Sequence, residues 1–356
     1  MKYQIIVSNF KNEFIDSLDG VYDISFSTKI QSDGKFSFKI DWADKQNTTE
    51  TIKMFNLIVI ERYNSKKNIW QNIYAGFIED IDLKENFIEV RGDGLLKFFK
   101  HRYSRSTDTI IGEKAENVID DLLNYSIGLG DSPPFEMGIK DADILVDFNL
   151  TRQRLNETFM NVAAAAGKDI WIDENLKVNI GNRGENKSEL EGITFDYYLP
   201  ETINTNGINA SYSSLDFANR IIGRSNSIES IQEIAHQDFP MIEKVQSFSG
   251  IASVETLDMR TIEFLKDLSS VVPSISVQPI NADIMLDEYT VGDYVSVYCR
   301  FKGRIIEAEM RIVEIKNKID DNGADNLSIS LSQSRNVKTT LIDVISRMES
   351  KVNAII

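Results

Sequence analysis

The sequence predicts an α+β protein rich in β-strands, in which two β-sections flank a small α+β module and a helix follows. Two observations predict this fold class. Apolar and polar residues alternate over much of residues 1–104 and again after Pro273, which is the period of a strand with one buried face. From about Gly112 to Gly167 the apolar period becomes that of an α-helix.

The first β-section, residues 1–104, is predicted to hold a hairpin followed by a meander. Apolar residues alternate over 22–30 and 36–40, and Asp33-Gly34 supplies the turn between them. Three apolar-rich runs with polar turns between them predict the meander strands: 54–63, 70–83 and 86–91. We expect Gly92-Asp93-Gly94 to end the last strand, because glycine weakens strands.

Residues 105–200 are predicted to form a small α+β module. A first helix is indicated by six residues, all but the last apolar, that lie on one helical face: Ala115, Val118, Ile119, Leu122, Leu123 and Ser126. Glu113 and Glu116 lie near its N-terminal end, where negative charge is stabilising. A strand, a second amphipathic helix and a hairpin follow: 144–148, 155–163, and 169–172 with 176–180.

The second β-section, residues 201–335, carries a helical insertion around 254–268 and ends in three strand-like runs: 291–301, 305–316 and 326–332. The central runs of the two meanders, Gly76–Ile81 and Met310–Ile315, are each followed by a turn and a shorter closing strand. We interpret this as a structural repeat. The alternative, that any two antiparallel meanders look alike in one sequence, stays open.

Residues 336–356 are predicted to form a C-terminal helix with an apolar stripe. The stripe consists of Val337, Leu341, Val344, Met348, Val352 and Ile355. Its spacing of three and four residues is typical of a coiled-coil seam, and so short a helix is marginal alone. We expect the stripe to contact another subunit or a spike, with packing against its own domain as the alternative.

The charge and cysteine content exclude several classes of protein. The 356 residues include 39 Lys and Arg against 55 Asp and Glu, a net charge of -16 that disfavours tight binding to nucleic-acid phosphates. The single cysteine, Cys299, cannot form an intrachain disulfide, and its place in an alternating strand predicts burial. Neither an export signal nor a run of ~18 apolar residues is visible, so we expect no membrane anchor.

Signatures of catalysis are scarce. Gly167-Lys168 lacks the first glycine of a phosphate-binding loop, and the two histidines, His101 and His236, have no second thiol or zinc-binding spacing beside them. We therefore expect no enzymatic activity and no catalytic, cofactor-binding or metal-binding residue. A carboxylate pair that cleaves peptidoglycan or another carbohydrate remains the alternative, because carboxylates are plentiful.

Five segments carry a family resemblance: Tyr74–Ile81, Ile88–Leu96, Ala115–Ile119, Val291–Val295 and Leu327–Leu331. In their order along nearly the whole chain they resemble the baseplate hub proteins of phage tails, whether contractile, siphophage or tailocin-like. The resemblance implies two β-barrel tube-type domains: residues 1–104, and residues 201–335 with the helical insertion. Residues 105–200 would lie between them as the α+β module and 336–356 would form the C-terminal helix.

The resemblance also implies a function and partners. Such hubs form trimeric rings in which two barrels per subunit present six to a hexameric tail tube, and so adapt the tube to a central spike or fibre. The implied partners are two further copies, the tail tube protein, distal tail or baseplate proteins, the spike or fibre, and the tape-measure protein. DNA would pass without specific binding. The implied location is the tail tip or baseplate of a virion or tailocin particle, after synthesis in the host bacterial cytoplasm.

Overall fold

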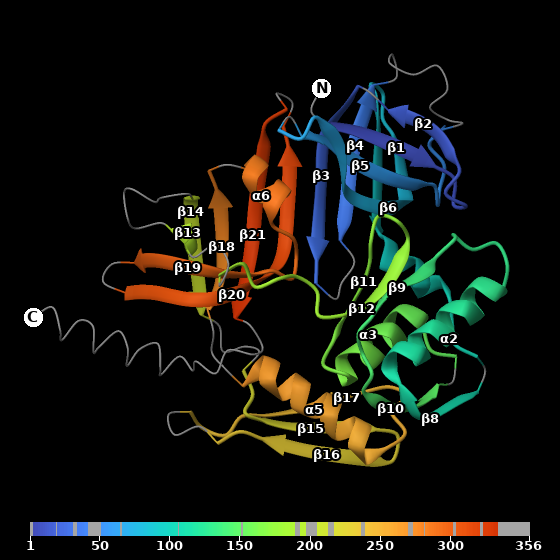
Figure 1. Cartoon of the computed structure of the whole chain (residues 1–356), viewed down its shortest axis with the longest axis vertical. Coiled ribbons are helices and arrows are strands. Elements are labelled where there is room, and N and C mark those ends of the chain that lie inside the picture. Colours follow the sequence, from blue (N-terminus) through green and yellow to red (C-terminus); the bar gives the residue numbers. More distant parts are fainter. Residues whose placement is uncertain are drawn as a thin grey trace, which may run out of the picture. The chain divides into compact units, whose positions relative to one another are not determined.

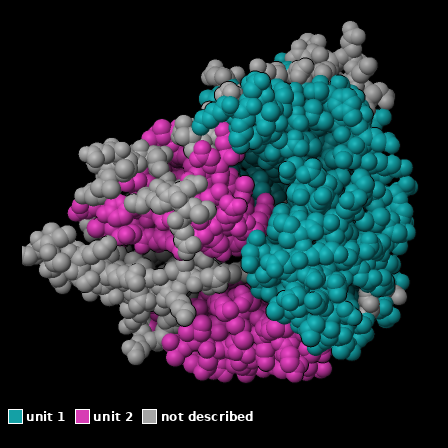
Figure 2. Space-filling model, in the orientation of Figure 1, with its two compact units in different colours: residues 1–182, 315–327 teal, residues 183–314, 328–356 magenta. Residues whose placement is uncertain are grey.

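The computed structural model (Figure 1) describes most of the chain. The described residues are 3–18, 20–30, 34–41, 51–64, 66–105, 107–150, 152–188, 193–196, 205–212, 217–235, 239–269, 273–280, 282–301, 304–320 and 323–333. They belong to two compact units (Figure 2). The first unit comprises residues 1–182 and 315–327, and the second comprises 183–314 and the chain from 328 onward.

The first unit contains an antiparallel run of strands in the order β3-β4-β7-β6-β5-β1-β2. Its strands are β1 (Tyr3–Ser8), β2 (Phe14–Leu18), β3 (Val21–Lys29), β4 (Lys35–Asp41), β5 (Leu57–Asn64), β6 (Ile69–Leu83) and β7 (Phe87–Gly94). One face of the run is apolar: Phe38, Ile78 and Val90 are fully buried in its core. The alternation in the sequence therefore marks the buried face, as predicted.

Two predicted strand boundaries in the first β-section are wrong, and in the second the strand predicted from residue 291 begins at Tyr294. Strand β7 continues through Gly92-Asp93-Gly94, because these residues pair with β4 and β6. A Cβ atom at Gly92 would lie 2.0 Å from the carbonyl oxygen of Phe77 and 2.5 Å from the ring of Phe36, so this glycine permits close approach inside the strand. Strand β5 begins at Leu57 and not at Met54.

The α+β region of the first unit contains both predicted helices, α2 (Ala115–Gly128) and α3 (Leu155–Ala165). Its other elements are η2 (Leu95–His101), β8 (Asp108–Lys114), β9 (Glu136–Lys140), β10 (Leu145–Leu150), β11 (Asp169–Ile172) and β12 (Lys177–Gly181). They form two small sheets, β10-β8 and β11-β12-β9. Three rings hold the region together, since the Phe99 ring centroid lies 5.0 Å from that of Phe135 and 5.1 Å from that of Phe159.

The second unit contains strands in the order β14-β18-β21-β20, and β19 pairs with both β20 and β13. These strands are β13 (Ile193–Asp196), β14 (Thr205–Tyr212), β18 (Pro273–Pro279), β19 (Tyr294–Phe301), β20 (Arg304–Ile319) and β21 (Asp325–Gln333); helix α6 spans Ala282–Glu288. A separate sheet, β16-β15-β17, and helix α5 lie between β14 and β18 in the chain. These inserted elements are β15 (Arg220–Ser225), β16 (Ile228–Glu233), β17 (Glu243–Ser247) and α5 (Val254–Leu268).

The end of the β20–β21 hairpin, residues 315–327, belongs to the first unit. There β20 neighbours β3, and Ile319 is buried in the core of the first unit. Tyr3 in β1 donates a hydrogen bond to Asp325, and Asn317 Nδ2 donates one to the same Asp325 Oδ1 at 2.8 Å. Burial raises the pKa of Tyr3, so its hydroxyl keeps the proton that it donates.

The structure is thus β-rich with helices, as an α+β fold class requires. Among the described strands no pairing closes a sheet into a barrel, so the two barrels stay a prediction. The predicted four-part division at residues 104, 200 and 335 likewise stays a prediction.

Candidate assembly surfaces

Two sets of five strands share one order. The first repeat is β3-β4-β7-β6-β5 and the second repeat is β14-β18-β21-β20-β19. In each, two paired strands are followed by a meander whose last strand pairs with the second of the two. The repeats differ between their first two strands, where the second carries β15, β16, β17 and α5. This shared order supports the structural repeat predicted from the two meanders.

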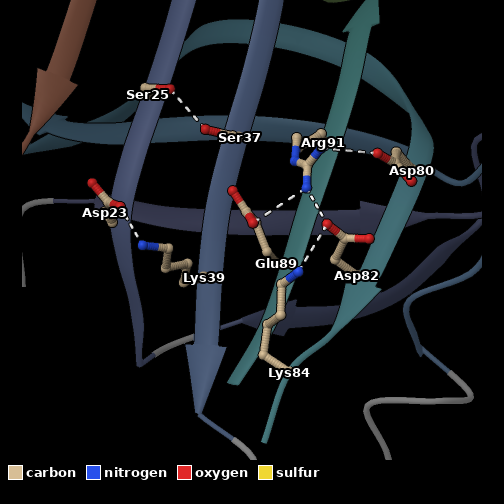
Figure 3. A network of polar contacts seen from close by, with 9 residues as sticks. All are labelled: Asp23, Ser25, Ser37, Lys39, Asp80, Asp82, Lys84, Glu89 and Arg91. Carbon is tan, nitrogen blue, oxygen red and sulfur yellow. Dashed lines mark hydrogen bonds and ion pairs between the residues drawn. The ribbon is translucent and has the colours of Figure 1, made fainter. Parts of the chain in front are cut away.

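The exposed face of the first repeat carries a network of ion pairs (Figure 3), which we call the charged ladder. Lys39 Nζ lies 2.7 Å from Asp23 Oδ2, and Lys318 Nζ lies 3.3 Å from the other oxygen of that carboxylate. Arg91 contacts Asp80 at 3.1 Å and Glu89 at 3.3 Å, and it also pairs with Asp82. Lys84 completes the set at 3.4 Å from Asp82.

The charged ladder is electrically balanced. Its four carboxylates face four cations: Asp23, Asp80, Asp82 and Glu89 against Lys39, Lys84, Arg91 and Lys318. The hydrogen bond from Lys39 holds the pKa of Asp23 below its ordinary value. Glycoside cleavage needs a carboxyl group whose pKa is raised. Asp23 is shifted in the opposite direction, which makes it a poor general acid.

The second repeat has hydroxyl groups where the first has charges. On β18, Ser274, Ser276 and Gln278 alternate with the buried Ile275 and Val277. We call the serines of this face of β18 and β21 the serine ladder: Ser274, Ser276, Ser328, Ser330 and Ser332. The Oγ atoms of Ser276 and Ser328 lie 3.3 Å apart, much as those of Ser25 and Ser37 lie 2.8 Å apart in the first repeat.

Among the described residues, helix α5 covers one face of the inserted sheet β16-β15-β17. Ile221 packs with Leu265 of α5, and Gln232 Nε2 donates a hydrogen bond to Asp258 Oδ1 at 3.1 Å. A Cβ atom at Gly223 would lie 2.1 Å from the hydroxyl of Thr261, so only glycine allows this close approach of helix and sheet. Because side chains alternate along strands, the neighbouring residues point to the other face.

That other face, which we call the open face, carries three rows across the strands. Cross-strand partners give the rows Glu233-Arg220-Glu243, Ile231-Ile222-Val245 and Glu229-Arg224-Ser247. Arg220 lies 3.3 Å from Glu243 and Arg224 lies 2.8 Å from Glu229. The middle row is apolar, yet Ile231 is 49% and Val245 56% exposed. Protein–protein interfaces typically have an apolar centre and a polar rim, and an exposed apolar row between two charged rows resembles this arrangement.

The residues predicted as an oligomer or spike contact are not tested by these surfaces. Val337, Leu341, Val344, Met348, Val352 and Ile355 all lie outside the described residues. The sequence did not predict the open face. Its strands bury small or polar residues against α5, such as Gly223 and Ser230, so the buried face lacks the apolar pattern that marks a strand. The signal that could have found it is the alternation of isoleucine with Arg and Glu on one face.

The described cysteine and histidine, Cys299 and His101, have different surroundings. Cys299 is buried, as predicted, and burial raises the pKa of its thiol to about 12. His101 is half-exposed, and its Nε2 atom lies 3.9 Å from Glu79 Oε1. Partial burial lowers the pKa of His101, and the positive charge of Lys100 lowers it further. Within the described ranges, no group of three His, Cys, Asp or Glu side chains could hold a metal ion. Nor does that part of the chain contain a helix long and apolar enough to span a membrane.

Comparison with solved structures identifies the fold. A 43 kDa tail protein of prophage MuSo2 from Shewanella oneidensis matches with a TM-score of 0.64 at 12% identity, over 93% of this chain and 98% of that chain. A prophage tail protein from Listeria monocytogenes matches with a TM-score of 0.59 at 12% identity, over 98% and 99%. An Escherichia coli component of the type VI secretion system matches with a TM-score of 0.54 at 10% identity, and the match covers 93% of this chain and 76% of that chain.

No protein-family model matches the sequence, and a search of curated proteins finds no match either. At such low identities the structural matches establish the fold and nothing finer. They do so over nearly the whole length of both chains for the two prophage proteins. The expected resemblance is therefore confirmed at the level of the fold: the chain has the fold of phage tail proteins.

Proposed function

We propose that this protein is the structural baseplate hub of a phage tail or phage-tail-like particle. One observation carries the proposal: a chain with a tail-protein fold contains two five-strand repeats of the same order. Three copies would present six such repeats, which matches the symmetry of a hexameric tail tube. On this proposal the repeats form the two tube-type barrels, and the trimeric ring adapts the tube to a central spike or fibre.

The proposed partners are two further copies, the tail tube protein, distal tail or baseplate proteins, the tape-measure protein and the spike or fibre. The proposed location is the tail tip or baseplate of the particle. The charge supports passage of DNA without specific binding, since the chain carries a net charge of -16 and its charged ladder has no excess of cations.

The role we propose is structural and not enzymatic. The carboxylates of the charged ladder are each held by a cation, and the pKa of Asp23 is lowered. A cell-wall assay tests this point. Purified protein incubated with bacterial cell walls should release no soluble sugar or peptide, and release that disappears on replacing a carboxylate would show that the protein is a tail enzyme.

The C-terminal stripe of residues 337–355 remains our proposed contact with the spike or a second subunit. Leu341→Asp and Met348→Asp should weaken particle assembly while the far-ultraviolet spectrum stays unchanged, because charge in an apolar seam disfavours helix pairing. Unchanged assembly of both variants would remove the stripe from the proposal.

The first experiment is the native mass of the purified chain by light scattering, followed by negative-stain imaging of the peak. We expect a mass near three chains and rings with a central hole. A chain that stays monomeric, and is missing from purified particles when these are probed with an antibody, would refute the hub.

A further inference from the structure

The end of the β5–β6 hairpin in the first unit presents two aromatic rings on one face of the sheet. Tyr63 of β5 pairs with Trp70 of β6, and their ring centroids lie 5.4 Å apart with the planes tilted by 60°. Trp70 is 38% exposed, whereas Ile60 and Arg62 of β5 are buried on the opposite face. The aromatic pair therefore lies on the solvent side of the sheet.

A row of polar side chains lies beside the aromatic pair. Gln4 of β1, Glu61 of β5 and Asn72 of β6 are successive cross-strand partners, so their side chains share one face of the sheet. Glu61 and Asn72 each lie two positions from an aromatic residue, on the same face and about 7 Å away along the strand. We call the five side chains the aromatic platform: Gln4, Glu61, Tyr63, Trp70 and Asn72.

Hydrogen bonds at the hairpin end hold the platform in place. The Tyr63 hydroxyl donates to Asn68 Oδ1, which fixes the orientation of the phenol ring. Asn64 Oδ1 accepts from the backbone N–H of Lys66 at 3.0 Å, and Asn64 Nδ2 donates to Gln71 Oε1 at 2.9 Å. Because the turn is already ordered, a ligand that binds to the platform loses little free energy in ordering it.

The platform combines an exposed ring with unused hydrogen-bonding groups. Gln4 Nε2 donates to Glu61 Oε2, but no hydrogen bond from another described residue reaches Glu61 Oε1 or the amide of Asn72. An amide can both donate and accept, and a carboxylate oxygen accepts. An apolar protein contact would bury these groups without partners, which is unfavourable.

A saccharide satisfies both parts of the platform. Each of its hydroxyl groups can donate and accept, so neighbouring hydroxyls can bond to an amide and a carboxylate at the same time. The C–H groups on the face of a pyranose ring form an apolar surface that packs on an aromatic ring. When the hydroxyls are equatorial, both faces of the pyranose ring carry only C–H groups.

We propose that the aromatic platform binds a neutral oligosaccharide of pyranose units with equatorial hydroxyls. One pyranose ring stacks on Trp70 beside Tyr63, and its hydroxyl groups bond to Asn72 and to Glu61 Oε1. The saccharide is held and not cleaved. This site goes beyond the proposed hub role and does not depend on it.

A titration with chitotetraose tests the site, with NMR of the tryptophan indole N–H groups as the measurement. The chain has three tryptophans, and the indole signal that is missing from Trp70→Ala is that of Trp70. We expect this signal to move as the saccharide is added. The expected dissociation constant is about 1 mM, since one stacked ring and a few hydrogen bonds give weak binding.

Two variants and one control separate recognition from folding. Trp70→Ala should weaken binding about ten-fold, and Asn72→Ala should weaken it several-fold, as measured by saturation transfer from the protein to the saccharide. The matched control is Ile69→Ala, which should bind like the wild type. Ile69 is 49% exposed on the same hairpin, and alternation directs it to the opposite face from Trp70. Far-ultraviolet spectra should be unchanged in all three variants.

A Trp70 signal that stays in place at about ten times the expected dissociation constant would overturn the site. Equal affinities of the wild type, Trp70→Ala and Asn72→Ala would also overturn it, because the saccharide would then bind elsewhere. Light scattering separates this result from the proposed function. A wild type that binds chitotetraose through Trp70 but stays monomeric supports the site while the hub fails, and a ring that does not bind the saccharide does the reverse.

Discussion

The two repeats have the same strand order but present different exposed faces. The first repeat covers its exposed face with the charged ladder around Arg91, and the second covers the matching face of β18 and β21 with serines. Beneath both faces lie fully buried apolar residues, such as Phe38 and Ile329. The comparison teaches that the buried face specifies the strand order, while the exposed face is free to differ between repeats.

The connections show the same freedom. In the first repeat β3 and β4 are joined by a short hairpin, whereas in the second a whole sheet and helix α5 stand between β14 and β18. A long insertion at one turn adds little loop-closure entropy, so it need not disturb the repeat. The insertion supplies the open face, for which the first repeat has no counterpart.

The strongest way to break the comparison is to remove one buried side chain from each repeat. Phe38→Ala should lower the free energy of unfolding by about 3–5 kcal/mol and Ile329→Ala by about 2–5 kcal/mol, since each leaves a cavity in a packed core. Calorimetry measures both. If either variant unfolds like the wild type, the corresponding buried face does not specify its repeat.

A smaller effect is expected from the exposed faces. Arg91→Met should destabilise the first repeat, because Asp80, Asp82 and Glu89 lose their shared cation and repel one another. Ser276→Ala, in the serine ladder of the second repeat, should change stability by less than about 1 kcal/mol. Urea titrations at low and high salt decide the point. Only the Arg91→Met loss should shrink in high salt, and a salt-independent loss would contradict the ladder.

The pH dependence sharpens the comparison further. The Asp23 pKa lies below its ordinary value of 3.8, so its stabilising contribution is fully present above pH 3.8 and is lost as the pH falls through the folded-state pKa. Lys39→Met should raise the Asp23 pKa toward 3.8 more than Lys318→Met does, because Lys39 makes the larger contribution. Carbon NMR of the carboxyl group measures both shifts, and equal shifts would contradict this ranking.

The smallest effect concerns β19, the last strand of the second repeat, which lies between β20 and β13. Cys299 is buried and its pKa is raised to about 12, so iodoacetamide at pH 8 should leave it unlabelled in the folded protein. In denaturant it should react fully, which is the control. Labelling of the folded chain at the denatured rate would show that β19 opens readily.

Much of the fold could be predicted where apolar residues recur along the sequence with a regular spacing. Helix α2 follows from five apolar residues and Ser126 on one face, and the hairpin β3–β4 follows from strict alternation. Strands β9 and β13 were not predicted, because each pairs in parallel with a strand distant in sequence and leaves no local signal. Gly92 was misread because a glycine that admits a neighbouring backbone looks like a turn residue.

The surfaces were harder to predict than the fold. The sequence predicts that Met54 and Phe55 begin a strand. The positive φ of Phe55 and the buried residues on either side show that they form an exposed turn instead. The charged ladder depends on register, which brings Glu89 of β7 beside Lys39 of β4. Register is set by pairing across the sheet, so spacing along one strand could not reveal it.

The contact of Tyr3 with Asp325 joins residues 322 positions apart. A ribosome that adds about 5–20 residues per second needs roughly 16–65 s to make the second partner after the first. During that time the N-terminal strands have been made but lack the hairpin end that carries Ile319 into their core. A nascent chain that stops early cannot complete the first unit. Completion of the first unit therefore waits until the end of the β20–β21 hairpin has been synthesised.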